Sequence, residues 1–370
     1  AVATAATSSS VAASSTSDST RIGTADDAAG SLRPEVAFPP QQPLQQDQVN
    51  YYSSISPAAH ALMDKYKGKF VCISAPQYPH CEIYLCGTLH VAHSSVSMVK
   101  EAIRGLKPNY VVLELCEGRI DNLEDYEDAA AANLTMIEVV RGSIEQRSFK
   151  SFGMGLLTWM QLKAAKLMGS RLGGEQSVAS KEAYLQGATV VLGDRLYGVT
   201  LQRIFDHLNA WEKLKMIFVI LWEVLTMSLF KVKEYIRKTE NEESFIRDEI
   251  TRFSKHMPAF ANVIISERDE YLTQTICEIA RVGFGKLPPP GVTYFRKGKI
   301  LAVVGAGHLE GIQRHLIGSA ATGITEERLL EISSSSKHNA TWPGKGMLHV
   351  IDPAALYAPK TKDNSVLTKQ

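Results

Sequence analysis

The sequence predicts an α/β protein with a mostly parallel central sheet flanked by helices, an extended helical insertion and a disordered N-terminal tail. Three observations predict this fold class. Short apolar runs rich in β-branched residues recur along the chain, helical patterns separate them, and polar signatures follow four of them. The composition, 45% hydrophobic and 21% charged, is ordinary for a globular protein that folds in water.

The predicted strands are short apolar runs with the length of buried strands. The four main runs are Ile83–Cys86, Tyr110–Leu115, Thr189–Leu192 and Ile300–Val304. An earlier run, Phe70–Ile73, predicts an edge strand that forms a hairpin with the first of them across the turn at residues 74–80.

Helical patterns fill the intervals between the main runs. They cover residues 95–105, 122–169, 201–238 and 242–280. Strands that alternate with helices in this way indicate a largely parallel sheet covered on both faces.

These elements predict one α/β domain over residues 66–317. Residues 1–65 form a low-complexity tail, first rich in Ala, Ser and Thr and then in Pro and Gln, a composition that cannot bury enough surface to become ordered. The remnant of an organellar transit peptide is the alternative interpretation of its start. Residues 318–370 are expected to be a loosely ordered extension.

Charge and cysteine content narrow the functional classes. Forty basic and 39 acidic residues leave a net charge of +1, which gives no whole-protein field for nucleic acid, so no nucleic-acid partner is expected. Five cysteines without a Cys-x-x-Cys pair indicate free thiols in a reducing, intracellular compartment.

One apolar stretch, Leu214–Phe230, could be mistaken for a membrane span. Lys215 and Glu223 interrupt it, and a spanning helix needs about 20 mostly apolar residues. We therefore expect no integral membrane segment. A buried helix is the favoured interpretation, and a helix around residues 211–230 that lies on a partner protein or a membrane surface is the alternative.

Polar signatures follow the four main runs. They are Gly87-Thr-Leu-His90, Glu114-Leu-Cys-Glu117-Gly-Arg119, Gly193-Asp194-Arg195 and Gly305-Ala-Gly-His308. Ligands of open α/β sheets lie beyond the carboxyl ends of the strands, and parallel strands deliver these ends to one edge. The signatures therefore predict one shared polar site.

The residue types at this edge suit hydrolysis. Two histidines and a glutamate match the pattern that binds zinc or iron and leaves positions open for water, and metal-bound water can attack a carbonyl. Without a metal, a histidine could act as the base. Arg119, Arg195 and Arg268 could bind a substrate carboxylate or stabilise an oxyanion.

Each residue also has a structural interpretation. Glu114 could form a buried ion pair with Arg119 or Arg195 instead of reacting. Asp194 and Arg195 could cap and pair after a strand, and residues 266–269 could be a helix cap with acidic first-turn residues. A single Gly-x-x-His is more often structural, but two copies after strands favour a shared site.

In these signatures the chain resembles the TraB family (the TraB/PrgY/Tiki-type group). The matching elements run in family order: GTLH at 87–90, VVLELCEGR at 111–119, GGE at 173–175, LGDR at 192–195, SERDEYL at 266–272 and VVGAGHLEGI at 303–312. The resemblance implies an α/β fold with a site on the two histidines. Tiki-like members are regarded as metal-dependent proteases, bacterial members are linked to shutting down peptide pheromone, and some eukaryotic members are associated with mitochondria or organelle contacts.

The resemblance implies that His90, Glu175 and His308 bind a divalent metal, with Zn, Mn and Fe not distinguishable. It implies neighbouring roles for six further residues, which are Glu114, Glu117, Arg119, Arg195, Glu267 and Arg268. Ser177 stands where the family commonly has an arginine. No nucleotide cofactor is expected.

Three functions follow. The leading one is a metal-dependent hydrolase acting on peptides; the second is a metal-free hydrolase with a histidine base. The third, which rests on Ser177 and the apolar helix, is a non-catalytic adaptor or organelle-contact protein. The expected location is the cytoplasm or an association with mitochondria, or another organelle if a transit peptide was removed. The sequence leaves the oligomeric state open.

Overall fold

The structure, a computed structural model, describes most of the chain from residue 55 to residue 351. The described residues are 55–73, 75, 77–89, 92–120, 123, isolated positions between 141 and 167, 173–242, 244–284, 298–317, 324–344 and 347–351. Most of the predicted tail and nearly all of the helix predicted at 122–169 lie outside them, as does His90.

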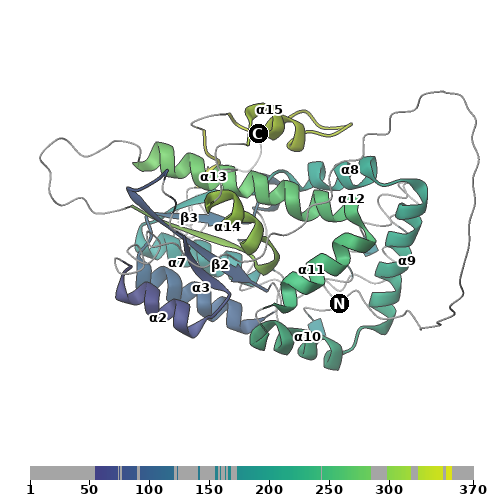
Figure 1. The fold of residues 1–370 in the computed structure, drawn as a ribbon, viewed down its shortest axis with the longest axis horizontal. Coiled ribbons are helices and arrows are strands. Elements are labelled where there is room, and N and C mark those ends of the chain that lie inside the picture. Colours follow the sequence, from purple (N-terminus) through teal and green to yellow (C-terminus); the bar gives the residue numbers. More distant parts are fainter. Residues whose placement is uncertain are drawn as a thin grey trace, which may run out of the picture. The chain divides into compact units, whose positions relative to one another are not determined.

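Six strands of the described residues form one mixed sheet, which confirms the predicted α/β fold class. The strands are β1 (Phe70–Ile73), β2 (Cys81–Thr88), β3 (Tyr110–Leu113), β4 (Thr189–Leu192), β5 (Gly298–Gly305) and β6 (Val350–Ile351). Their order across the sheet is β1-β2-β5-β3-β4-β6 (Figure 1). The four inner strands are parallel, and β1 and β6 pair antiparallel at the two edges.

Helices cover both faces of the sheet, as the alternation of strands and helices predicts. One face carries α2 (Pro57–Lys65), α3 (His93–Leu106) and α7 (Gly174–Gln186), and the other carries α13 (Glu267–Phe284) and α14 (Leu309–Ile317) (Figure 1). Between the sheet and α13 and α14 lies the main hydrophobic core, where buried aliphatic residues such as Ile83, Ile276 and Ile312 meet. This core fixes where α13 begins, and with it the side chains of its first turn.

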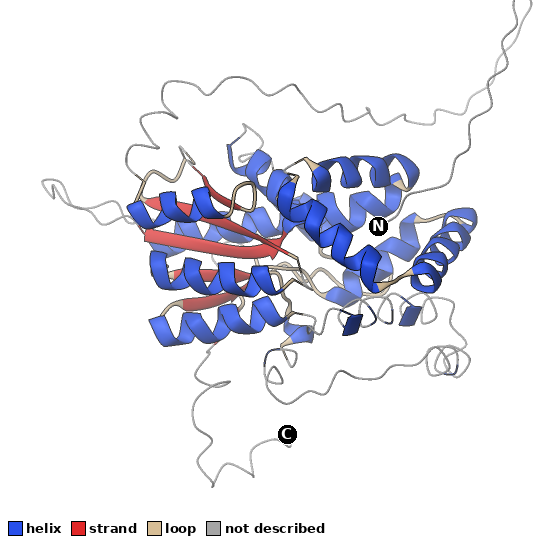
Figure 2. Ribbon diagram, turned by 90° about the horizontal axis from the view of Figure 1, so that it is seen from below, coloured by secondary structure: helices blue, strands red, loops and turns tan. Residues whose placement is uncertain are grey.

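A second group of helices lies beside the sheet. It consists of α8 (Tyr197–His207), α9 (Ala210–Thr226), α10 (Leu229–Asn241), α11 (Phe245–His256) and α12 (Pro258–Ala261), followed by a π turn, Asn262–Ser266, that leads into α13. Figure 2 shows these helices (blue) past one end of the strands (red).

The helical pattern predicted at 201–238 is divided into α8, α9 and α10 by two side-chain caps. Asn209 and Glu212 form a reciprocal capping box at the start of α9, with hydrogen bonds of 2.8 and 2.9 Å. The Ser228 hydroxyl accepts the amide of Lys231 at the start of α10. Apolar periodicity alone does not reveal these breaks because it continues through both caps.

The favoured interpretation of residues 214–230 as a buried helix describes only one side of α9. Met216, Ile217 and Val224 are buried, but Trp211 and Phe218 on the other side are exposed. Among the described residues, no helix combines the length and the apolar character needed to cross a membrane.

The segment after residue 318, expected to be a loose extension, supplies two elements that pack on the sheet domain. Helix α15 (Glu326–Ile332) contacts α13, and β6 pairs with β4 through Val190 and Ile351. Ile332 and Ser333 are fully buried. The sequence that contains α15 and β6 has little apolar periodicity, so the sequence pattern does not indicate this packing.

Candidate functional site

The polar signatures lie at one edge of the sheet because the strands that precede them are parallel and in register. Thr88 in β2 pairs with Gly305 in β5, and Leu113 in β3 pairs with both Val303 in β5 and Leu192 in β4. Glu114 and Asp194 each follow the last residues of adjacent strands. The sheet therefore delivers carboxylates and the turn that carries His308 to the same edge.

Arg268 is the centre of a cluster at this edge, which we call the Arg268 cluster: Glu114, Asp194, Arg268, Asp269 and His308. The Arg268 side chain comes from the first turn of α13 and is 12% exposed. Its Nη2 donates to Glu114 Oε1 and, at 2.8 Å, to Asp194 Oδ2. Burial opposes the charge of Arg268, but attraction to Asp194 and Glu114 outweighs it and raises the pKa of the guanidinium.

Glu114 is a buried acceptor, and two of its donors lie in the described part of the chain. Besides Arg268 Nη2, the amide of Gly305 donates to its Oε2. The expected ion-pair partners, Arg119 and Arg195, do not fill this role. Arg119 Nη2 instead donates to the main-chain carbonyl of Glu114 at 3.1 Å. Arg268 lies 154 residues further along the chain, so no local pattern could assign this pairing.

His308 is oriented by Asp269 and faces Glu114 and Arg268. Its Nδ1 lies 2.6 Å from Asp269 Oδ1, while its Nε2 lies 3.0 Å from Arg268 Nη1 and 3.4 Å from Glu114 Oε1. Burial and the charge of Arg268 both disfavour the protonated ring. Attraction to Glu114 and the bond to Asp269 outweigh them and raise the pKa of His308 to about 9. Nε2 therefore faces two opposite demands: Arg268 Nη1 can only donate to it, which needs an unprotonated nitrogen, whereas the raised pKa favours a protonated ring whose Nε2–H faces Glu114 Oε1.

Gly311 in α14 leaves the space that the Asp269 carboxylate occupies. A Cβ at residue 311 would lie 1.8 Å from Asp269 Oδ2 and 2.4 Å from its Cγ. The spacing from His308 to Gly311 places the glycine one helical turn after the histidine. Helix α14 thus leaves room for the carboxylate that orients the imidazole.

Arg119 lies beside the Arg268 cluster and is more exposed than Arg268 or His308. Its Nη2 is 3.7 Å from Asp194 Oδ2, and its guanidinium lies over the Tyr197 ring at 5.4 Å. The side chain is 31% exposed, whereas its Nε is buried and has no hydrogen-bond partner among the described residues. The exposed part of the guanidinium can contact a carboxylate or carbonyl oxygen of a ligand.

Glu117 and Glu175 lie in different surroundings. Glu117 has a side chain that is 59% exposed and lies 2.7 Å from His349 Nδ1. Glu175 is fully buried in the first turn of α7, near Cys86, whose pKa is raised by burial and by the charge of Glu175. Ser177, at the position where the resemblance expects an arginine, donates its hydroxyl to the carbonyl of Leu123 at 3.2 Å.

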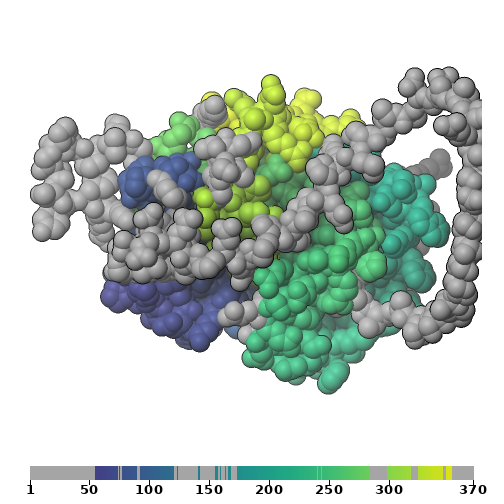
Figure 3. All heavy atoms as spheres, viewed as in Figure 1, coloured from purple at the N-terminus to yellow at the C-terminus, as the bar shows by residue number. Residues whose placement is uncertain are grey.

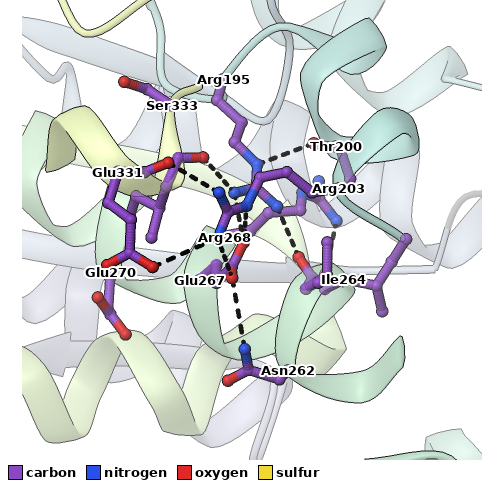
Figure 4. A network of polar contacts seen from close by, with 12 residues as sticks. Arg195, Thr200, Arg203, Asn262, Ile264, Glu267, Arg268, Glu270, Glu331 and Ser333 are labelled. Atoms are coloured by element: carbon purple, nitrogen blue, oxygen red, sulfur yellow. Dashed lines mark hydrogen bonds and ion pairs between the residues drawn. The ribbon is translucent and has the colours of Figure 1, made fainter. Parts of the chain in front are cut away.

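Arg195 and Glu267 belong to a second buried cluster with Arg203, which we call the Arg195 cluster (Figure 4). Arg195 Nη1 donates to Glu267 Oε2 at 2.7 Å, and Arg203 donates two bonds of 2.8 Å to both oxygens of the same carboxylate. Burial works against ionisation of Glu267, but the two arginines lower its pKa overall.

The Arg195 cluster ties four chain segments together. Arg195 Nε donates to Thr200 Oγ1 in α8, and its remaining nitrogens donate to the carbonyls of Val263 and Ile332. With 0% side-chain exposure and each of its three side-chain nitrogens hydrogen-bonded within the protein, the Arg195 guanidinium is closed off from a ligand in this structure. This arrangement favours the pairing role that the sequence also allows for Arg195, and its assignment to substrate stays a prediction.

Sequence reasoning places Glu114, Arg268 and His308 in one site, and the structure brings these three together. It misses Asp194 and Asp269, which it interprets as capping residues, and Arg203. Asp194 and Asp269 each precede or follow a predicted site arginine, and that adjacency was the available signal. Arg203 has no such signal because its partner, Glu267, is 64 residues away.

The described residues do not complete the expected metal site, because one of its three ligands lies outside them. Of the donors that they do contain, His308 Nε2 and Glu114 Oε1 both contact the Arg268 guanidinium. Within the described part of the chain, no group of three His, Cys, Asp or Glu side chains could hold a metal. His90, the other expected ligand, lies outside it.

Comparisons with known proteins point to one family. The model of the TraB/PrgY/gumN family matches residues 77–328. An uncharacterized protein of Methanocaldococcus jannaschii is 28% identical over 240 residues, which are 64% of this chain and 53% of that protein. TraB domain-containing proteins of mouse and human are each 26% identical over 245 residues, 63% of this chain and 62% of theirs. The chain thus matches less than two thirds of the length of these relatives.

Proposed function

The chain belongs to the TraB/PrgY/gumN family, and from this premise we propose that it is a hydrolase whose reaction centre is the Arg268 cluster. The observation that carries the proposal is the pairing of His308 with Asp269, which directs the other ring nitrogen to Glu114 and Arg268. A carboxylate that holds one imidazole nitrogen fixes the ring so that the other can transfer protons.

His308 and Glu114 divide the proton transfers of hydrolysis. With its pKa at about 9, the His308 ring carries a proton at neutral pH and can donate it from Nε2 to the leaving group. The ionised Glu114 takes the proton of the attacking water. The Nε2–Oε1 distance of 3.4 Å then allows the proton to return from Glu114 to His308, which resets the site.

Two arginines supply the positive charge that such a reaction needs. Arg268 places its charge against the Glu114 carboxylate, and the partly exposed Arg119 guanidinium is the group proposed to contact a substrate oxygen. A peptide is the first substrate class to test, because the resemblance to Tiki-like proteins implies peptidase activity and Arg119 suits a carboxylate or an amide carbonyl.

The test compares hydrolysis of a mixed peptide library, read by mass spectrometry, between the full chain and its His308→Gln variant. Loss of the proton donor is expected to lower the rate by a factor of about 100 or more. His256→Gln is the matched control, because His256 is exposed and lies outside the cluster. Circular dichroism and denaturant unfolding check that both variants fold.

Elemental analysis of the same samples addresses the metal. Hydrolysis that survives chelation, in protein without stoichiometric metal, supports this proposal. Activity that requires a metal, together with loss of bound metal in His90→Ala, would favour the metal-dependent reaction expected from the resemblance. A His308→Gln variant as active as the control would refute the role of the cluster and leave the adaptor function.

A further inference from the structure

The outer side of α9 carries a continuous line of exposed large apolar residues, which we call the α9 stripe. Its members are exposed by 55% to 72% and are Trp211, Leu214, Phe218, Trp222 and Leu225. They recur every three or four positions, so they lie along one side of the helix. Figure 1 shows α9 on the side of the helical region that faces away from the sheet, and Figure 3 shows its residues (teal) at the surface.

The fold does not need the α9 stripe. The opposite side of α9 supplies Met216, Ile217, Ile220 and Val224 to a hydrophobic cluster formed with α8, α12 and the π turn. That inner side already anchors the helix. An exposed apolar patch that core packing does not explain marks an interaction surface.

The apolar surface continues past the end of α9 and meets positive charge. Leu229 and Phe230 are exposed at the start of α10, and Lys231 and Lys233 beside them are exposed as well. Neither lysine forms an ion pair within the described residues, whereas the nearest acid of α10, Glu234, is paired with Arg237 at 2.7 Å. Free positive charge therefore borders the apolar surface.

We propose that the α9 stripe and the start of α10 dock on the surface of a bilayer that contains anionic lipid. A protruding helix with Trp, Phe and Leu on its outer side and lysines beside them has the composition of helices that lie in a membrane interface. Indole rings favour the boundary between headgroups and acyl chains. The lysines complement anionic headgroups. Helix α9, with 17 residues, lies on the bilayer instead of crossing it.

The test is co-sedimentation of the full chain with phosphatidylcholine vesicles that contain about one third phosphatidylserine. Because it replaces two large apolar side chains of the stripe by charged ones, Phe218→Glu/Trp222→Glu is expected to weaken binding at least about 100-fold. The matched control is Leu185→Glu/Val282→Glu, which makes the same change in charge at two exposed apolar residues on α7 and α13. We expect the control to bind like the wild type.

A second variant tests the charge. Lys231→Gln/Lys233→Gln is expected to lose about ten- to thirty-fold in affinity for these vesicles at low salt, and little at high salt. Thermal unfolding of all variants should match the wild type, since every substituted residue is exposed.

Three results would overturn the proposal. The wild type could stay in the supernatant with these vesicles, or the control could lose as much binding as the stripe variant. Light scattering could also show that the wild type is a dimer and the stripe variant a monomer, while neither protein binds the vesicles. In that case a second copy of the chain covers the α9 stripe.

Discussion

The Gly311→Ala substitution separates the orientation of His308 from ordinary helix stability. In most helices, replacing glycine by alanine stabilises by up to about 1 kcal/mol. Here the new Cβ would lie 1.8 Å from Asp269 Oδ2, 2.4 Å from Cγ and 3.0 Å from Cβ of the same residue. The Asp269 carboxylate must therefore move away from His308.

The magnitude follows from two losses and one gain. Overpacking costs about 1–3 kcal/mol, and losing the charge-assisted bond between Asp269 and His308 costs about 1.5–3 kcal/mol. The gain in helix propensity, at most about 1 kcal/mol, does not offset them. We expect Gly311→Ala to lower the free energy of unfolding by about 2–5 kcal/mol.

Denaturant unfolding measures this change, and an NMR titration follows the ring of His308. Its pKa should fall from about 9 because one of the groups that raise it has moved. Gly105→Ala in α3 is the matched control, since its Cβ would meet only the Ala58 Cβ at 3.8 Å and should stabilise slightly. In an Asp269→Ala background, Gly311→Ala should cost less, because only the contact with Cβ remains.

A Gly311→Ala variant as stable as the wild type, with the pKa of His308 unchanged, would refute this reasoning. It would mean that Asp269 can leave the space beside Gly311 without giving up its bond to the imidazole. The orientation of the ring would then not depend on the glycine at position 311.

Other predictions concern the buried charges. Arg268→Gln should destabilise by about 3–5 kcal/mol in denaturant unfolding, because it leaves buried carboxylates without their counter-charge, whereas Arg237→Gln on the surface should change stability by less than about 1 kcal/mol. The lowered pKa of Glu267 means that its stabilisation is present above its ordinary value of 4.5 and is lost as the pH falls through the folded value; Glu267→Gln should flatten the acid side of a plot of melting temperature against pH. The raised pKa of His308 means that its stabilisation is complete below 6.5 and is lost as the pH rises through about 9; an alkaline slope equally steep in His308→Gln would contradict this.

The sequence predicts the sheet well because buried parallel strands leave a strong local pattern. The runs at 110–115, 189–192 and 300–304 correspond to β3, β4 and β5, with ends that differ by at most two residues. The edge strand β6 has only two residues, and its pairing with β4 depends on packing between distant segments. No local pattern can predict such a strand.

The site was predictable to the extent that strand ends determine it. Glu114 and His308 follow parallel strands, so their convergence could be expected from topology. The separation of Glu267 from Arg268 could not. These neighbours in α13 point to different clusters because successive helical residues lie about 100° apart. The sequence motif contains both residues, but in the structure Glu267 contacts Arg195 and Arg203, and Arg268 contacts Glu114 and Asp194.

The bonds from the Arg195 cluster to α15 set the shortest fragment that can be expected to fold. A recombinant piece that stops at residue 317, where the sequence pattern suggests the domain ends, would delete the carbonyls of Glu331 and Ile332. Those oxygens accept from Arg203 and Arg195. Each interior N–H left without an acceptor costs about 1–3 kcal/mol, so expression plasmids for this protein should run at least through residue 351.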